Sequence, residues 1–211
     1  LKNWVGAARA TELLNNVTDM QRYLSLTKQK LLFDAGVAAW KTGDAKKADR
    51  YLTEVEELDS NSPYMNDVYF LRAEIRIFLK RFEDARRDLA RVATRGMQLK
   101  RLGYWNKAQV LTGETFLAEK DYNKAYASFS FVADALLQKT KDQIDPHSAS
   151  PEFAPYLEQA LYRAAFCASL LGMNQEPDFI VDQYVKKYGE FYPNGKYASE
   201  IRSLPKPITQ K

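Results

Sequence analysis

The sequence predicts an all-α protein built from pairs of short helices. Glycine and proline are scarce among the 211 residues, at nine and eight, which favours uninterrupted helix. Apolar residues recur at helical spacing along most of the chain, and short polar turns separate the apolar segments. Hydrophobic residues make up 45% and charged residues 27% of the sequence, as in ordinary globular domains, so a disordered protein is excluded.

The clearest helix pair lies between Gln29 and Ser62. Two amphipathic segments flank a three-residue turn, residues 42–44. Gly43 tolerates the positive φ at which a helix can end, and Asp44 can cap the second helix by accepting backbone N–H bonds. Small residues stand where the helices must approach closely, and larger apolar residues lie between them, which predicts tight packing. The small residues are Ala35, Gly36, Ala39 and Ala48, and the large ones are Leu32, Trp40, Leu52, Val55 and Leu58.

Three further pairs follow, starting near residues 66, 106 and 158. Ala85 and Ala125 take the place of Ala48 in the second and third pairs. The four starts are separated by 37, 40 and 52 residues, which predicts a less regular stack than a strict repeat. The last interval contains the irregular, proline-containing segment 139–155, which we interpret as a loop between pairs.

These pairs resemble the tetratricopeptide repeat (TPR), a helix–turn–helix unit with a 34-residue period. With Gln29 as the first position, the large and small packing positions of the family are occupied by Leu32, Ala35, Gly36, Ala48 and Leu58. Ser60 stands where the family usually has proline, and Arg72 replaces an expected leucine in the second pair. The resemblance covers about 29–204 and implies a TPR-like α-solenoid of about four repeats with an additional N-terminal helix.

The resemblance also implies a binding site, because this family holds extended peptides or partner helices in a concave groove lined by its first helices. Chaperone-binding members clamp a terminal carboxylate with Lys and Asn, where Phe33 and Val37 stand here, so that activity is not expected. The groove positions, carried over residue by residue, are mainly apolar with a few charges of both signs. The candidate partner-binding residues are Phe33, Val37, Trp40, Lys41, Phe70, Glu74, Ile77, Phe78, Lys107, Glu114, Tyr162 and Phe166.

Two segments flank the predicted repeat domain 29–204. Residues 1–28 are interpreted as an N-terminal capping helix and residues 205–211 as a polar tail. The capping helix has a broken apolar stripe, which leaves two possibilities. Either the groove is open to a partner, or residues 1–28 fill it and the chain is a structural spacer in a longer repeat protein.

The run Tyr192-Pro193-Asn194-Gly195-Lys196-Tyr197-Ala198 predicts a turn between two helices. It is similar to a Tyr-Pro-Asn-Ser-x-Tyr-Ala junction common in bacterial outer-membrane assembly lipoproteins and Tol-Pal coordinator proteins. This second resemblance implies a periplasmic, outer-membrane-associated location within a multiprotein complex, with a cytoplasmic location as the alternative.

The sequence carries no motif of a catalytic or cofactor site. It lacks a Gly-rich phosphate loop, GxSxG, HExxH and paired cysteines, so we expect neither an enzyme nor a cofactor or metal. The single cysteine, Cys167, is interpreted as a small buried hydrophobe, and the single histidine, His147, as a solvated loop residue. No stretch approaches eighteen consecutive apolar residues, so any membrane tether is expected outside these residues.

Charge patterning offers an alternative function. From Arg72 to Arg101 there are ten Lys or Arg against four Asp or Glu, whereas Tyr51–Asp67 has five acids and no Lys or Arg. The basic run could bind nucleic acid or another anionic surface. We favour a non-enzymatic scaffold or adaptor that binds a protein partner, and nucleic-acid binding is not expected.

Overall fold

The computed structural model describes the backbone of residues 2–173 and 180–204, and the side chains of residues 20–173 and 180–204. All regular structure in these ranges is helical, which confirms the predicted all-α class. The chain divides into two compact units, Leu1–Leu79 and Lys80–Lys211. The predicted polar tail 205–211 lies outside the described residues.

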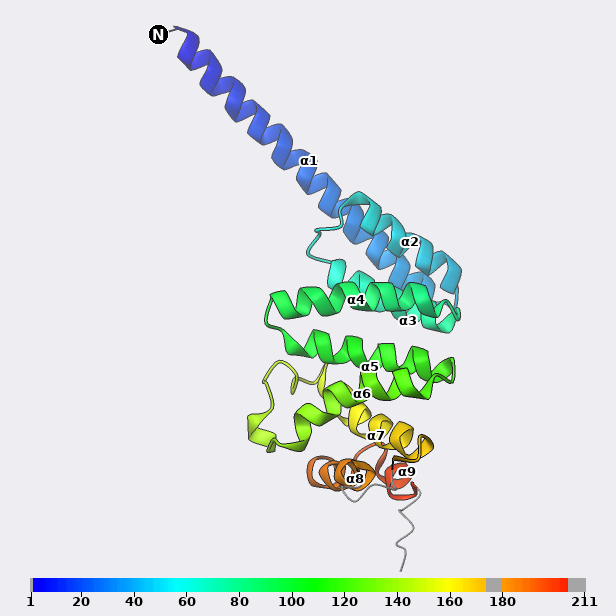
Figure 1. Ribbon diagram of the computed structural model, residues 1–211. Helices are drawn as coiled ribbons and strands as arrows, with labels where there is room; N and C mark the ends of the chain where they lie inside the picture. The colour runs from blue at the N-terminus through cyan, green and yellow to red at the C-terminus, as the bar shows by residue number, and fades with distance from the viewer. Residues whose placement is uncertain (1, 174–179, 205–211) are drawn as a thin grey trace, which may run out of the picture. The chain divides into compact units, whose positions relative to one another are not determined.

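The first unit contains three helices, α1 (Lys2–Lys41), α2 (Ala45–Leu58) and α3 (Met65–Phe78). Both α1 and α3 pack against α2, and the N-terminal half of α1 extends beyond these two partners (Figure 1). The helix boundary expected at residue 28 is absent, because α1 continues through it. The sequence explains this continuity, since no glycine or proline occurs between Gly6 and Gly36.

The α1–α2 pair closes at the small residues that the sequence analysis identified. A Cβ atom at Gly36 would lie 3.0 Å from the side chain of Leu52, and Ala48 is fully buried beside it. The turn also follows the prediction, since Gly43 has a φ of 88° and the Asp44 side chain accepts the Lys47 N–H at 3.0 Å. These two helices therefore pack at a distance that larger residues would not allow.

The second unit is a series of helices in which each packs on the next. They are α4 (Phe82–Gln98), α5 (Leu102–Ala118), α6 (Tyr122–Leu137), α7 (Ala154–Leu170), α8 (Ile180–Phe191) and the short α9 (Ala198–Arg202), with a 3₁₀ turn, η1, at Lys141–Gln143 (Figure 1). Helix α5 also contacts α7. The core of this unit combines alanines with larger aliphatic and aromatic residues, and its largest buried members include Phe129, Leu157, Leu161, Tyr184 and Tyr188.

Several helix ends use one residue in the left-handed backbone conformation. Gly43 and Gly172 take it without a steric penalty, but Lys80, Lys100 and Lys120 take it as well, with φ values of 59°, 54° and 62°. After α5 the Lys120 and Asp121 N–H groups donate to carbonyls of the last helical turn, at 3.0 and 2.9 Å. This is the Schellman arrangement that glycine usually completes.

The irregular segment between α6 and α7 is a loop, as predicted, but it is docked on α5. The N–H of Gly103 donates to Nδ1 of His147 at 3.1 Å, and the His147 ring stacks on Phe153 with centroids 4.8 Å apart. The Asn106 side chain donates to Ser148 Oγ at 3.0 Å. The expectation of a solvated His147 is therefore wrong, because a glycine at the start of α5 leaves room for the imidazole.

The buried alanines of the helix pairs provide a test of this packing. Ala125 is fully buried against α5, whereas Ala127 in the same helix is exposed. We expect Ala125→Leu to lower the free energy of unfolding by about 1–3 kcal/mol through overpacking, and Ala48→Leu to act in the same way. Urea denaturation measures the change. Ala127→Leu is the matched control and should shift the value by about 0.5 kcal/mol or less.

The lysines in the left-handed backbone conformation give a second prediction, in which a substitution stabilises the protein. Lys120 lies between helices, exposed and with a positive φ, so Lys120→Gly relieves strain and should raise the free energy of unfolding by about 1 kcal/mol. Lys186 is exposed in the middle of α8, where Lys186→Gly should lower the free energy of unfolding by about 1 kcal/mol. Equal thermal shifts for the two variants would contradict the assigned turn conformation.

Candidate partner-binding surfaces

In the first unit, the predicted groove residues lie on α1 and α3, and we call this area the α1–α3 surface. The ring of Trp40 meets that of Phe78 edge to face, with centroids 5.3 Å apart. Phe78 is 66% exposed, although it is a large apolar residue. Val37 and Ile77, on the same two helices, are half-buried, so the surface is apolar and partly open to solvent.

The remaining predicted residues of this unit differ in their exposure. Lys41 is exposed and Glu74 is half-buried. Phe33 stacks on Tyr64 with centroids 6.4 Å apart. Phe70 is only 4% exposed, so it is a core residue and cannot form part of an open surface. Its burial follows from the position of α3, which has buried residues around most of its circumference.

In the second unit, the predicted groove residues lie on α5 and α7, and we call this area the α5–α7 surface. Its centre is a carboxylate, Glu114, which accepts from Arg163 Nε at 2.6 Å and from Gln159 Nε2 at 2.8 Å. A second guanidinium nitrogen of Arg163 donates to the other oxygen of Glu114 at 3.2 Å. This two-point pairing fixes both side chains, and each remains about one-quarter exposed.

Aromatic rings lie near this ion pair, and the guanidinium carbon of Arg163 is 5.4 Å from the ring centre of Tyr162. Tyr162 stacks face to face on Tyr197, with centroids 4.6 Å apart, and its ring centroid lies 6.2 Å from that of Phe166. At the opposite end of α5, the ammonium of Lys107 lies 5.3 Å from the ring centre of Tyr156. The structure thus places Lys107, Glu114, Tyr162 and Phe166 on two contacting helices, all of them half-buried.

The C-terminal junction, residues 192–198, holds one of the aromatic rings of this surface in place. The hydroxyl of Tyr188 donates to Glu158 at 2.5 Å and accepts the N–H of Tyr197 at 2.8 Å, which holds the Tyr197 ring against Tyr162. Burial, together with the hydrogen bond to Glu158, raises the pKa of Tyr188, so this hydroxyl remains a donor across the physiological range. The Tyr192–Ala198 run therefore has a structural role in the second unit.

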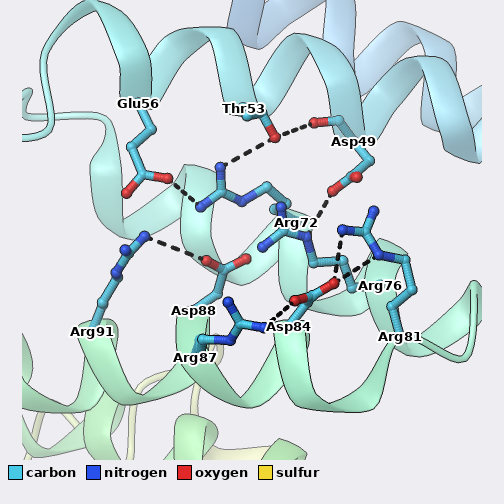
Figure 2. Close-up of polar contacts among 10 residues, drawn as sticks. All are labelled: Asp49, Thr53, Glu56, Arg72, Arg76, Arg81, Asp84, Arg87, Asp88 and Arg91. Atoms are coloured by element: carbon cyan, nitrogen blue, oxygen red, sulfur yellow. Dashed lines mark hydrogen bonds and ion pairs between the residues drawn. The ribbon is translucent and has the colours of Figure 1, made fainter.

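Most arginines of the basic run 72–101 form ion pairs with acids, in both units. In the first unit, Arg72 is fully buried and donates to Glu56 at 2.6 Å and to Thr53 at 3.4 Å (Figure 2). Arg76 pairs with Asp49 at 2.8 Å. Both arginines lie on α3 and both acids on α2, so the unexpected arginine at position 72 joins these two helices.

Arginines in α4 and directly before it are also paired with acids within the second unit. Asp84 accepts from both Arg81 and Arg87 at 2.7 Å, as Figure 2 also shows. Six of the ten basic residues counted between 72 and 101 have an acidic partner, and these are Arg72, Arg76, Arg81, Arg86, Arg87 and Arg91. The local excess of positive charge is therefore much smaller than the sequence count indicates.

Metal-binding clusters and reactive cysteine thiols are groups that often mark a catalytic site. Within 20–173 and 180–204, no group of three or more His, Cys, Asp or Glu residues is placed to hold a metal ion. Cys167 is fully buried, which confirms its predicted role, and burial raises the pKa of its thiol to about 12. A thiol in that state is a poor nucleophile. No described helix has the length and apolar character needed to cross a membrane.

Three residues of these surfaces were missed by the sequence analysis. Arg163 and Tyr197 complete the α5–α7 surface, and Tyr64 covers Phe33. Arg163 follows Tyr162 directly but is outside the groove positions of the repeat, and its partner is 49 residues away. The aromatic residues of the junction 192–198 were the only sequence signal for Tyr197.

Comparison with known proteins does not assign the chain to a family. No family model matches the sequence, and no curated protein matches it either.

The Glu114–Arg163 pair can be tested by a double-mutant cycle with Glu114→Gln and Arg163→Gln. Because both side chains are largely desolvated, we expect a coupling energy of about 1 kcal/mol in urea denaturation. The pair Lys30–Asp34 on the surface of α1 is the control, and it should show a much smaller coupling that high salt removes. A coupling near zero for Glu114 and Arg163 would contradict the paired geometry.

Proposed function

We propose that this chain is a non-enzymatic interaction module in which TPR-like helix pairs form an α-solenoid that holds a segment of a partner protein. The α1–α3 surface is the proposed principal contact. Its partner is an extended segment or a helix with apolar side chains, which pack on Trp40 and Phe78. In this role the chain is a scaffold or adaptor within a larger assembly.

The exposure of Phe78 carries this proposal. A phenylalanine that is 66% exposed contributes little to the core, and here it lies against a second large aromatic ring instead of standing alone. Aromatic anchors that become buried on association are common among the few residues that dominate the binding energy at protein interfaces. Lys41 on α1 and Glu74 on α3 carry opposite charges, so they can set the orientation of the bound segment.

The α5–α7 surface offers a second, more polar contact. Tyr162 and Phe166 present half-buried rings beside the Glu114–Arg163 pair, an arrangement suited to polar or aromatic side chains of a partner. Because Glu114 is already held by two donors, it is not a strong site for a partner's cation. We therefore assign this surface a role in specificity.

The two alternatives have less support. Binding of nucleic acid through the 72–101 run requires accessible cations, but most of its arginines are paired with acids and Arg72 is buried. A spacer whose groove is filled by its own N-terminal helix requires α1 to fold back. Residues 20–24 are instead exposed, and Figure 1 shows that half of α1 extending past α2 and α3.

The location in a bacterial cell-envelope assembly is also part of the proposal. It rests on the similarity of the Tyr192–Ala198 run to junctions in outer-membrane assembly lipoproteins and Tol-Pal coordinator proteins. The hydrogen bonds of Tyr188 and Tyr197 account for the run as a structural turn, so its residues would be retained in any compartment.

The experiment is a photo-crosslinking amino acid at position 78, followed by affinity measurement with the purified protein that it captures. We expect Phe78→Ala to weaken that binding by about 2 kcal/mol or more, roughly 30-fold, with an unchanged helical circular dichroism spectrum. Trp40→Ala should have a similar effect, because it removes the ring on which Phe78 rests.

Phe131 is the matched control, since it is 65% exposed, meets the ring of Trp105 edge to face with centroids 5.0 Å apart, and lies in α6 of the other unit. Phe131→Ala truncates the same type of side chain at a similarly exposed position and should leave the affinity for the captured protein unchanged. Equal loss of affinity for the two variants, or no loss for either, would overturn the assignment of the α1–α3 surface.

A further inference from the structure

The turn between α4 and α5 exposes three large apolar side chains within six residues. Met97 is 62% exposed, Leu99 is 55% exposed and Leu102 is 43% exposed. They occupy the end of α4, the connecting turn and the first residue of α5, and we call residues 97–102 the apolar turn. A group of exposed large apolar side chains is a candidate contact with another surface.

The apolar turn has a fixed backbone. Arg101 N–H donates to Gly96 O at 2.8 Å and Lys100 N–H donates to Met97 O at 3.1 Å, the two hydrogen bonds of a Schellman end. Lys100 holds the left-handed conformation that this end requires. The exposed side chains are therefore presented by an ordered turn at the end of two packed helices, and binding would not have to order the backbone.

The charged residues that flank this turn along the sequence have one sign. From Leu89 to Gly113 the sequence contains five Lys or Arg and no Asp or Glu. Two of these cations, Lys100 and Arg101, lie inside the apolar turn and are exposed. The turn thus places two adjacent cations between apolar side chains, in the order Met97-Gln98-Leu99-Lys100-Arg101-Leu102.

We propose that the apolar turn is a peripheral contact with an anionic lipid bilayer. Leu99, Leu102 and Met97 would enter the interface between headgroups and acyl chains, while Lys100 and Arg101 reach the lipid phosphates. Long cationic side chains can lie along the apolar ones and keep their charges at headgroup level, so two cations between apolar residues are compatible with a bilayer.

A bilayer fits this surface better than a protein partner does. The apolar side chains are spread over a helix end, a turn and a helix start, and so they do not form the stripe at i, i+3, i+4 and i+7 by which a helix docks on a protein groove. A fluid interface needs no complementary shape, whereas it does need cations next to apolar groups. The inference goes beyond partner binding and uses none of the residues of the α1–α3 or α5–α7 surface.

The experiment is co-sedimentation of the 211-residue chain with phosphatidylcholine vesicles that contain or lack phosphatidylglycerol. We expect binding to the anionic vesicles only. Lys100→Gln with Arg101→Gln should reduce the partition coefficient about 30-fold, at roughly fivefold for each cation lost near the surface. The control, Lys28→Gln with Lys46→Gln, removes two exposed cations from the first unit and should leave binding close to wild type.

A second pair of variants separates insertion from adsorption. Leu99→Ser with Leu102→Ser retains every charge and should reduce binding about tenfold, whereas Leu24→Ser with Leu31→Ser, an exposed pair on α1, should not. Thermal denaturation confirms that each variant is folded. The proposal is overturned if the chain does not bind anionic vesicles, which would leave a protein as the occupant, or if both serine pairs bind like wild type.

Discussion

The close approach of paired helices is the constraint on which the other features depend. In the first unit Gly36 faces Leu52, and in the second Gly113 lies so close to Phe129 that a Cβ atom at this glycine would come within 2.6 Å of the phenylalanine ring. At these positions the side chain must be absent or very small, because protein interiors leave no unused volume. The predicted groove residues that remain partly exposed lie on the helices that pack against these pairs, Phe78 on α3 and Tyr162 and Phe166 on α7.

The local signals of the sequence were sufficient for the helix pairs but not for what joins them. Gly43 and Asp44 predict the first turn, and the structure confirms both roles. The position of Lys120 could not be predicted, because lysine is an unusual residue in a left-handed turn and only the hydrogen bonds after α5 require it there. The helix boundary expected at residue 28 was wrong. It was placed where the first repeat begins, at Gln29, but no residue there stops a helix.

Contacts between distant residues account for the other differences. His147 was expected in solvent because its neighbours are turn-forming residues, yet its partner is the backbone of Gly103, 44 residues away. The positive run around α3 and α4 was overestimated in the same way. A count of charges along the sequence ignores acids on the preceding helix, and Glu56 and Asp49 on α2 neutralise the two arginines of α3. Of the candidate site, the sequence could place residues on helices, whereas exposure and pairing required the structure.

The exposed apolar residues need an explanation other than folding. Phe129 fills the space left by Gly113, so its side chain is required for the core and indicates nothing about function. Phe78 and Leu99 lie mostly in water, and truncating them would remove little buried area, so the free energy of unfolding does not account for their presence. A single exposed phenylalanine or leucine is common at protein surfaces. Phe78 lies against Trp40, however, and Leu99 lies between Met97 and Leu102 beside two cations, so each belongs to a local group with a defined chemistry. An aromatic pair of this kind also occurs in the second unit, where Phe131 meets Trp105, so it is the adjoining cations of the apolar turn that support a different kind of partner there.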